Sequence, residues 1–178
     1  MRSNLFRAGL ASAWTLAMVV FAGCGPGVGG TGTGTTAFDA FHVSAASVCE
    51  GALAAQLDCA SPPAAMGPVA AGTQPVRFAD IAGQVTLELN GNLATLDALC
   101  LRLHFGGEFG VDAGSVEGFF GSYDIGGSGM NRLAALSAVP MAGGGVLTVE
   151  LRDADGSVVV KPVLLQRVTT MLPAPSPC

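Results

Sequence analysis

Positive charge is scarce in this chain. Its 178 residues include 8 lysines and arginines against 13 acidic residues, and Lys161 is the only lysine. Proteins that bind nucleic acids neutralise phosphates with clusters of Lys and Arg, and anionic membrane surfaces attract the same clusters. The composition therefore argues against a nucleic-acid partner and against a basic membrane-binding patch.

Catalytic signatures are absent as well. The sequence contains no G-x-S-x-G, S-x-x-K or Walker motif, the short motifs that mark several hydrolases and nucleotide-binding proteins. Ser122 and Ser128 lie among glycines, which is typical of a loop, and His42 and His104 belong to no recognisable motif. Histidines become catalytic only through specific partners, so we interpret His104 as part of a solvated strand face. We predict no catalytic residue and no cofactor; whether the protein is an enzyme stays open, with a non-enzyme favoured.

The acidic stretch near the end of the chain predicts a turn rather than a metal site. Asp153, Asp155 and Gly156 are similar to the start of a calcium-binding loop, but the glycine comes too early and the twelfth position is Leu164, where such a loop needs Glu. Apolar alternation on both sides favours a hairpin turn. We predict no metal site here.

The first 23 residues have the layout of a secretory signal peptide. Arg2 and Arg7 give a positive start, residues 8–20 form an uncharged apolar run, and small residues precede Cys24. The apolar run is shorter than the roughly 20 residues that a membrane-spanning helix needs. We therefore predict that this leader is removed by cleavage.

The residues around the cleavage point, VFAGC at 20–24, resemble the lipobox of bacterial lipoprotein precursors, with Phe21 where that family prefers Leu. The resemblance covers the leader only. It implies that Cys24 is diacylated on sulfur and, after cleavage, becomes the N-terminus that carries the membrane anchor. Gly25 stands where an Asp would retain such a lipoprotein at the inner membrane, so the resemblance implies the outer membrane. The alternative is an ordinary secretory signal cut near Ala22, with Cys24 incidental.

The remaining chain divides by composition into a tether and a domain. Residues 24–36 continue after the cysteine as GPGVGGTGTGTT, without charge, which is typical of a flexible linker. Residues 37–178 are enough for one domain with a real core. Once Arg2 and Arg7 leave with the leader, 6 basic residues remain against 13 acidic ones, a net charge of −7.

Four cysteines lie in the domain: Cys49, Cys59, Cys100 and Cys178. An even number in an exported chain predicts disulfides. Zinc is the alternative, but the chain has no C-x-x-C spacing, the usual signature of a structural zinc site. Three pairings are open. We favour Cys49 with Cys59, a short local loop, and Cys100 with Cys178, which would pin the end of the chain.

Alternation of apolar and polar residues predicts strands joined by glycine-rich turns. Val85 to Leu89 has the period of a half-buried strand, Asn90-Gly91 is a strong hairpin signal, and the chain is expected to return through 93–103. Further strands are expected at 38–43, 76–81, 116–125, 133–138, 147–152 and 157–168, with a short helical turn at 51–57. Pro162 suggests an edge or a bulge. We predict an all-β fold, a single antiparallel β-sandwich or barrel.

Two function classes remain. The first is a non-catalytic binding or structural module, held at the cell envelope by its lipid and facing an envelope protein or a glycan. The second is an envelope hydrolase or carbohydrate-active domain that uses scattered carboxylates such as Asp112, Glu117 and Asp124. These carboxylates would have to converge to about 5–10 Å to act as an acid/base pair.

Overall fold

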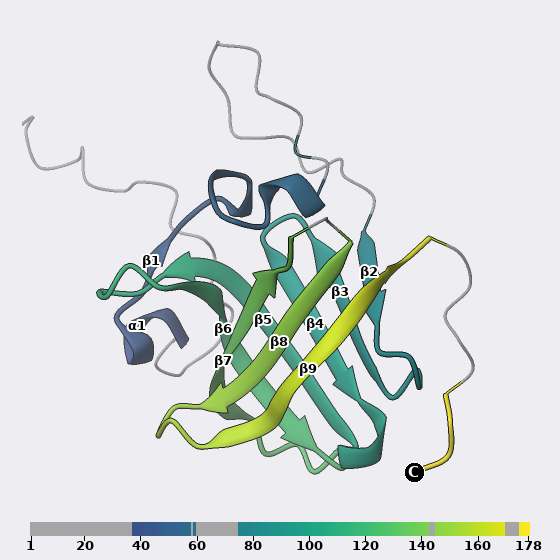
Figure 1. Cartoon of the computed structure of the whole chain (residues 1–178). Helices are drawn as coiled ribbons and strands as arrows, with labels where there is room; N and C mark the ends of the chain where they lie inside the picture. Colours follow the sequence, from purple (N-terminus) through teal and green to yellow (C-terminus); the bar gives the residue numbers. More distant parts are fainter. Residues whose placement is uncertain (1–36, 58, 60–74, 143–144, 170–174) are drawn as a thin grey trace, which may run out of the picture. The chain divides into compact units, whose positions relative to one another are not determined.

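The structure, a computed structural model, describes residues 37–57, 59, 75–142, 145–169 and 175–178 (Figure 1). The expected leader and tether, with Cys24, lie outside the described residues. None of the helices in the described ranges has the length and apolar character that a membrane span requires.

Eight strands form a closed antiparallel barrel in which each strand pairs with the next one along the chain (Figure 1). Closure comes from the last strand, which pairs with the first of the eight through Arg77↔Val168, Phe78↔Arg167 and Ala79↔Gln166. The predicted all-β fold is thus confirmed, and its form is the barrel. The strands are β2 (Val76–Ala79), β3 (Val85–Asn90), β4 (Leu93–Ala98), β5 (Leu103–Val111), β6 (Glu117–Ile125), β7 (Arg132–Pro140), β8 (Val146–Asp153) and β9 (Val158–Val168).

Alternation along the strands sends one set of side chains into the barrel. Cross-strand partners on neighbouring strands form rows of side chains inside the barrel, such as the row Leu87↔Leu96↔Phe105↔Tyr123. An eight-stranded barrel is just wide enough for side chains to fill, and the buried set here is large and apolar. Its fully buried members include Phe78, Phe105, Phe109, Phe119, Tyr123, Leu87, Leu89, Leu96, Leu136, Leu147, Leu151 and Leu165.

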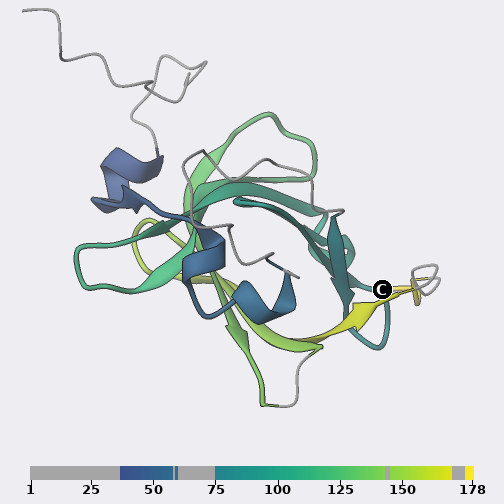
Figure 2. The same cartoon turned by 90° about the horizontal axis from the view of Figure 1, so that it is seen from above.

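One end of the barrel is covered by residues 46–57, which contain the 3-10 turns η1 (Val48–Glu50) and η2 (Ala54–Gln56) (Figure 2). Val48, Leu53 and Leu57 belong to the buried core, so this segment, the cap, extends the interior. The end it covers is called the capped end, and the opposite one the far end. The helical turn expected at 51–57 is present as the 3-10 turn η2.

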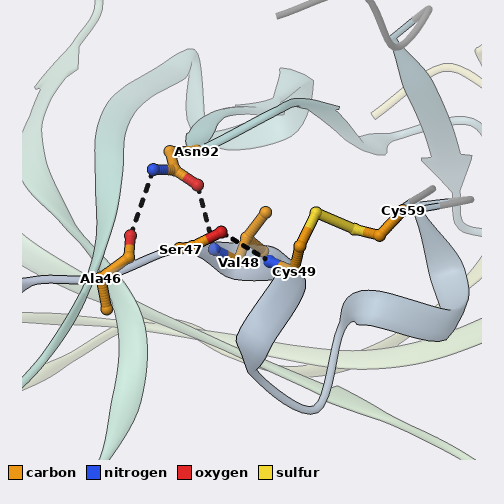
Figure 3. Close-up of a disulfide and its surroundings, with 6 residues drawn as sticks. All are labelled: Ala46, Ser47, Val48, Cys49, Cys59 and Asn92. Atoms are coloured by element: carbon orange, nitrogen blue, oxygen red, sulfur yellow. Dashed lines mark hydrogen bonds between the residues drawn. A yellow bond between two sulfur atoms is a disulfide. The ribbon is translucent and has the colours of Figure 1, made fainter. Parts of the chain in front are cut away.

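Asn92, in the β3–β4 turn, holds the cap through its side chain (Figure 3). Its Oδ1 accepts a hydrogen bond from the backbone N–H of Val48 (3.0 Å) and its Nδ2 donates one to the carbonyl of Ala46 (3.1 Å). At the opposite side of the cap, Gln56 accepts a hydrogen bond from the N–H of Gly145 (3.0 Å). The cap is therefore tied to two separate turns of the barrel.

The structure pairs the cysteines as the sequence favoured. Cys49 and Cys59 form a disulfide across the cap, with Cα atoms 5.6 Å apart (Figure 3). Cys100 and Cys178 form the second, with Cα atoms 5.3 Å apart. The second bridge holds the C-terminal segment beside the β2–β3 turn, where the N–H of Ser176 donates a hydrogen bond to the carbonyl of Ala82 (2.9 Å).

The strand expected at 38–43 is wrong. This segment forms the short helix α1 (Ala37–Phe41), and only β1 (Ser44–Ala45) after it pairs as a strand, with β5. Helical spacing puts residues three apart on one face, and the rings of Phe38 and Phe41 both contact Phe120 (centroids 6.3 and 5.4 Å). Burying two rings on the barrel wall outweighs the weak alternation of the sequence.

Two turn details also differ from expectation. Strand β3 includes Asn90, which pairs with Leu93, so the hairpin turn is Gly91-Asn92, one residue later than expected. The return strand is also not continuous: η3 (Leu99–Leu101) interrupts it and Arg102 has φ +50°.

Pro162 lies where the register between β8 and β9 shifts, between Val160 and Val163, so the expected bulge is confirmed.

Candidate functional site

The three carboxylates of the hydrolase hypothesis stabilise local structure, and Asp124 lies far from Glu117. Asp112 accepts hydrogen bonds from the N–H groups of Gly114 (2.8 Å) and Val116 (2.9 Å) in the β5–β6 turn. Glu117 accepts one from the N–H of Ala52 (2.9 Å) and so holds the cap. Glu117 and Asp124 begin and nearly end strand β6, about 20 Å apart at strand rise. That separation is too large for a pair of carboxylates to act on one bond.

Asp124 is held by a serine hydroxyl at the far end of β6. Ser128 Oγ donates a hydrogen bond to Asp124 Oδ1 (2.6 Å), and this bond, with weaker ones from nearby backbone N–H groups, lowers the pKa of Asp124 below its ordinary 3.8. A carboxylate held in this way stays ionised and is a poor general acid at neutral pH.

His104 lies on the outer face of β5 between two aspartates of the neighbouring strands. It is opposite Asp97 on β4 and Asp124 on β6, and its Nδ1 is 2.8 Å from Asp97 Oδ1. Both side chains are open to solvent, 66% and 45% exposed. The hydroxyl of Ser128, a candidate nucleophile, is bonded to Asp124. The arrangement is the solvated strand face expected from the sequence.

The turn at Asp153 to Gly156 is a hairpin turn, as predicted. The N–H of Ser157 donates to Asp153 Oδ1 (3.2 Å) and to Asp155 Oδ1 (2.8 Å). Hydrogen bonding with the Asp153 side chain, followed by Ser157, lowers the pKa of Asp155 to about 2. Arg132 neutralises the nearly buried Asp153 (3.0 Å). Within the described ranges, no group of three or more His, Cys, Asp or Glu side chains is placed to hold a metal ion.

The hollows on the outer surface of the barrel include three that are lined by described residues. One of about 350 Å³ lies at the Arg132–Asp153 pair. One of about 290 Å³ lies between the Arg77–Glu88 ion pair and Asp97. The third has about 480 Å³ and crosses β4, β5, β6 and β7. The first two are built around charges that already have partners, so the third is the candidate site.

This third hollow, named here the Gly106 groove, consists of two neighbouring rows of outward positions. The rows follow from the strand register, in which Thr95, Gly106, Ser122 and Leu133 are successive cross-strand partners, as are Leu93, Glu108 and Phe120. Ala37 of α1 lines one side. The surface is largely apolar, with two hydroxyls and the Glu108 carboxylate as its polar groups.

The floor of the groove is made of glycine, and only part of that glycine is required by the fold. A Cβ at Gly121 would collide with the carbonyl oxygen of Gly106, and a Cβ at Gly107 would come within 2.5 Å of the Phe105 ring. A Cβ at Gly106 would meet nothing within 4 Å, and its φ is not in the left-handed region. The barrel therefore tolerates a side chain at position 106, although the sequence has none.

An unnecessary glycine inside a strand is a functional signal. Glycine in mid-strand costs about 0.5–1 kcal/mol relative to Ala, and it often marks a place where a ligand or another backbone approaches closely. Here the missing side chain leaves the Gly106 groove open between Thr95 and Ser122. The Gly106-Gly107 pair directly after the predicted return strand was the signal available in the sequence, and our interpretation of glycines as turn residues missed it.

No family model, no curated protein and no solved structure matches the chain.

Proposed function

We propose that this protein is a lipid-anchored module of the bacterial cell envelope that binds a protein partner in the Gly106 groove and performs no catalysis. The observation that carries the binding role is the glycine at position 106, where the fold has room for a side chain. The anchoring part rests on the resemblance of residues 20–24 to a lipobox.

A protein partner suits the groove better than a glycan. Phe120 is the aromatic residue of the groove, but its ring is covered by Phe38 and Phe41 and is only 6% exposed. The face of that ring is therefore not available to stack on a sugar. In the proposed complex a side chain of the partner enters the groove, where Leu93 and Leu133 offer apolar contacts. Glu108 is placed to pair with a Lys or Arg of the partner beside it, an arrangement typical of protein interfaces.

In this proposal residues 1–23 are the cleaved leader, Cys24 carries the lipid, residues 25–36 are the tether and residues 37–178 are the binding domain. Gly25 after the cysteine favours the outer membrane, and the net charge of −7 after cleavage argues against nucleic acid as a partner. We prefer binding to hydrolysis because Asp112, Glu117 and Asp124 each accept local hydrogen bonds and Asp124 lies at the opposite end of β6 from Glu117.

The binding role is tested by photo-crosslinking in cells of the native host. A crosslinking amino acid is placed at Thr95 or Leu133, on opposite sides of the groove, and for comparison at Thr148 on the outer face of β8. We expect one shared adduct from the two groove positions and its loss when Gly106→Leu fills the groove. The control, Thr148→Leu, places the same apolar side chain on the wall outside the groove and should leave the adduct unchanged. Adducts that persist in Gly106→Leu would overturn the groove as the binding site.

The anchor is tested separately by metabolic labelling with a clickable fatty acid. Labelled wild-type protein and unlabelled Cys24→Ala are expected, because S-acylation requires the thiol. Equal labelling of both would refute the lipobox interpretation.

A further inference from the structure

Apolar side chains gather at the far end of the barrel, on the connections between strands. Ile81 lies in the β2–β3 turn, Leu99 and Leu101 in η3, Ile125 at the end of β6 and Met130 in the β6–β7 loop. Their exposed fractions run from 46% for Leu99 to 74% for Met130 and 96% for Ile81. These five residues are called the apolar arc.

Backbone hydrogen bonds join the parts of the arc into one surface. The N–H of Leu99 donates to the carbonyl of Gln84 (2.8 Å), which connects η3 to the β2–β3 turn. The N–H of Gly126 donates to the carbonyl of Arg102 (2.7 Å), which connects η3 to the β6–β7 loop. The Cys100–Cys178 bridge fixes η3 from the other side. The arc is thus a fixed feature of the fold.

Arg102, directly after Leu101, is the second unusual feature of this surface. Its φ of +50° lies in the left-handed region, which L side chains other than Asn and Asp rarely adopt and which costs about 1 kcal/mol or more. Its side chain is exposed, and within the described residues it forms no salt bridge. Arg102 is thus strained and exposed among exposed apolar residues, without a salt bridge to any described residue. It costs the fold more free energy than the glycine that this turn would accept.

The carboxylates of Asp80 and Asp124, in or next to the connections that carry the arc, are already bonded inside their own turns. Asp80 Oδ1 accepts a hydrogen bond from the N–H of Val85 (2.8 Å), and Asp124 Oδ1 accepts one from Ser128 (2.6 Å). They therefore leave Arg102 available to an external anion. Because these carboxylates offset the arginine, attraction between charges does not drive docking here, and burial of the apolar arc must supply the free energy.

We propose that the apolar arc inserts into the interface of a phospholipid bilayer, with Arg102 on a lipid phosphate. Residues projecting from separate chain reversals suit a lipid surface, which moulds itself around them, whereas a folded partner needs a complementary shape. Apolar tips beside a basic residue are the usual composition of interfacial membrane contacts, and guanidinium pairs well with phosphate. The inference adds a second, direct membrane contact to the proposed lipid anchor.

The tether is long enough for this orientation. Ala37 shares the Gly106 groove with Phe120, and the five residues from there to Ile125 correspond to about 17 Å of strand. The 13 residues 24–36 reach about 43 Å when extended. A lipid on Cys24 and the apolar arc can thus meet the same bilayer, which would leave the Gly106 groove on the side wall of the barrel.

The test uses residues 37–178 without any lipid, so the proposed anchor plays no part in it. This domain contains all nine strands, the cap and both disulfides, and circular dichroism checks its fold. Cosedimentation with phosphatidylcholine vesicles is compared for the wild type, for Ile81→Ser with Met130→Ser, and for Val139→Ser with Met141→Ser. The last pair is the matched control, since Val139 and Met141 are 56% and 46% exposed at the capped end. A reporter is convenient, because Trp14 is the only tryptophan of the chain and the domain has none.

We expect the wild type and the capped-end variant to bind, the arc variant to bind about tenfold more weakly, and Ile81→Trp but not Val139→Trp to shift its fluorescence to the blue on vesicles. Arg102→Gly should bind severalfold more weakly although it relieves the strained φ. No binding by the folded wild type, or equal binding by all variants, would overturn the proposal. A dimer that depends on Ile81 and Met130 would overturn it too and assign the arc to a second copy of the chain. None of these results bears on the proposal that a partner binds in the Gly106 groove, because that proposal is tested separately by the crosslinking experiment.

Discussion

Gly121 of β6 packs against the backbone of Gly106 on the neighbouring strand β5, one residue out of register, and the two glycines differ in what the fold requires of them. The carbonyl oxygen of Gly106 occupies the place of a Cβ at position 121, while a Cβ at position 106 would point into open space. The close packing of β6 on β5 requires glycine at position 121, whereas the open space of the Gly106 groove requires glycine at position 106. Stability and binding measurements can therefore separate two roles that look identical in the sequence.

Gly121→Ala should be strongly destabilising, by about 3 kcal/mol, because the methyl group collides with backbone that cannot yield. Gly106→Ala should be neutral or stabilising by about 0.5–1 kcal/mol, since alanine restricts the unfolded chain at a φ it tolerates. Urea unfolding of both variants checks this. Equal destabilisation would contradict the assignment of Gly106 to the groove.

Asn92→Ala should destabilise the protein by about 1–3 kcal/mol. The substitution leaves the N–H of Val48 and the carbonyl of Ala46 without their partner, and unpaired, partly buried polar groups are costly. The matched control is Asn90→Ala, two residues earlier and exposed, for which a change within about 0.5 kcal/mol is expected. Thermal unfolding followed by circular dichroism measures both, and hydrogen exchange should show faster opening of the cap in Asn92→Ala alone.

The two disulfides should contribute unequally. By loop closure, the bridge across a sequence separation of 78 stabilises by about 4 kcal/mol and the bridge across 10 by about 3 kcal/mol. Cys100→Ser with Cys178→Ser should therefore lower the urea midpoint more than Cys49→Ser with Cys59→Ser does. Before any reduction, the unfolded wild-type domain should take up no alkylating reagent at its four cysteines. Alkylation above a trace would argue for free thiols.

Ser128→Ala should raise the pKa of Asp124 towards 3.8, because the hydroxyl bond is the main cause of the lowered value. A carboxyl whose pKa is lower in the folded state stabilises the fold above its unfolded pKa, and this contribution is lost as pH falls through the folded value. The stability difference between wild type and Ser128→Ala should therefore be full at neutral pH and shrink below about pH 4. Carboxyl titration by nuclear magnetic resonance measures the shift, with Ser137→Ala as the control that leaves Asp124 unchanged.

Local alternation was enough to predict most strands, because each inward side chain has an outward neighbour along β3, β6, β7 and β8. Closure into a barrel was not predictable in the same way. It depends on three residue pairs between β2 and β9 and on close packing at Gly107 and Gly121, where neighbouring atoms leave no room for a Cβ, and neither leaves a local pattern. The α1 segment was misread since Phe38 and Phe41 gain their burial from Phe120, which is distant in sequence.

The candidate sites were harder to predict than the fold. Whether the fold requires glycine at position 106 depends on the atoms that surround this position in space. One sequence does not contain that information. The carboxylates of the hydrolase hypothesis illustrate the opposite problem: Asp112, Glu117 and Asp124 are close in sequence, but extended chain carries Glu117 and Asp124 to opposite ends of one strand. The apolar arc was likewise hidden, because Leu99 and Leu101 have the alternation of Leu103 and Phe105, although they lie in η3, between the end of β4 at Ala98 and the start of β5 at Leu103.

The short seam between β2 and β9 has a consequence for the order in which the barrel forms. Every other barrel pair joins strands that follow one another in the chain, so seven hairpins can form locally as each strand is made. The seam joins Arg77 to Val168 and must wait for the last strand, at the greatest cost in loop entropy. With only three residue pairs it is also the place where the cylinder should open first. The barrel should therefore close last at the seam between β2 and β9 and open first at the same seam. The amides of β2 should exchange with solvent ahead of those in β5 and β6.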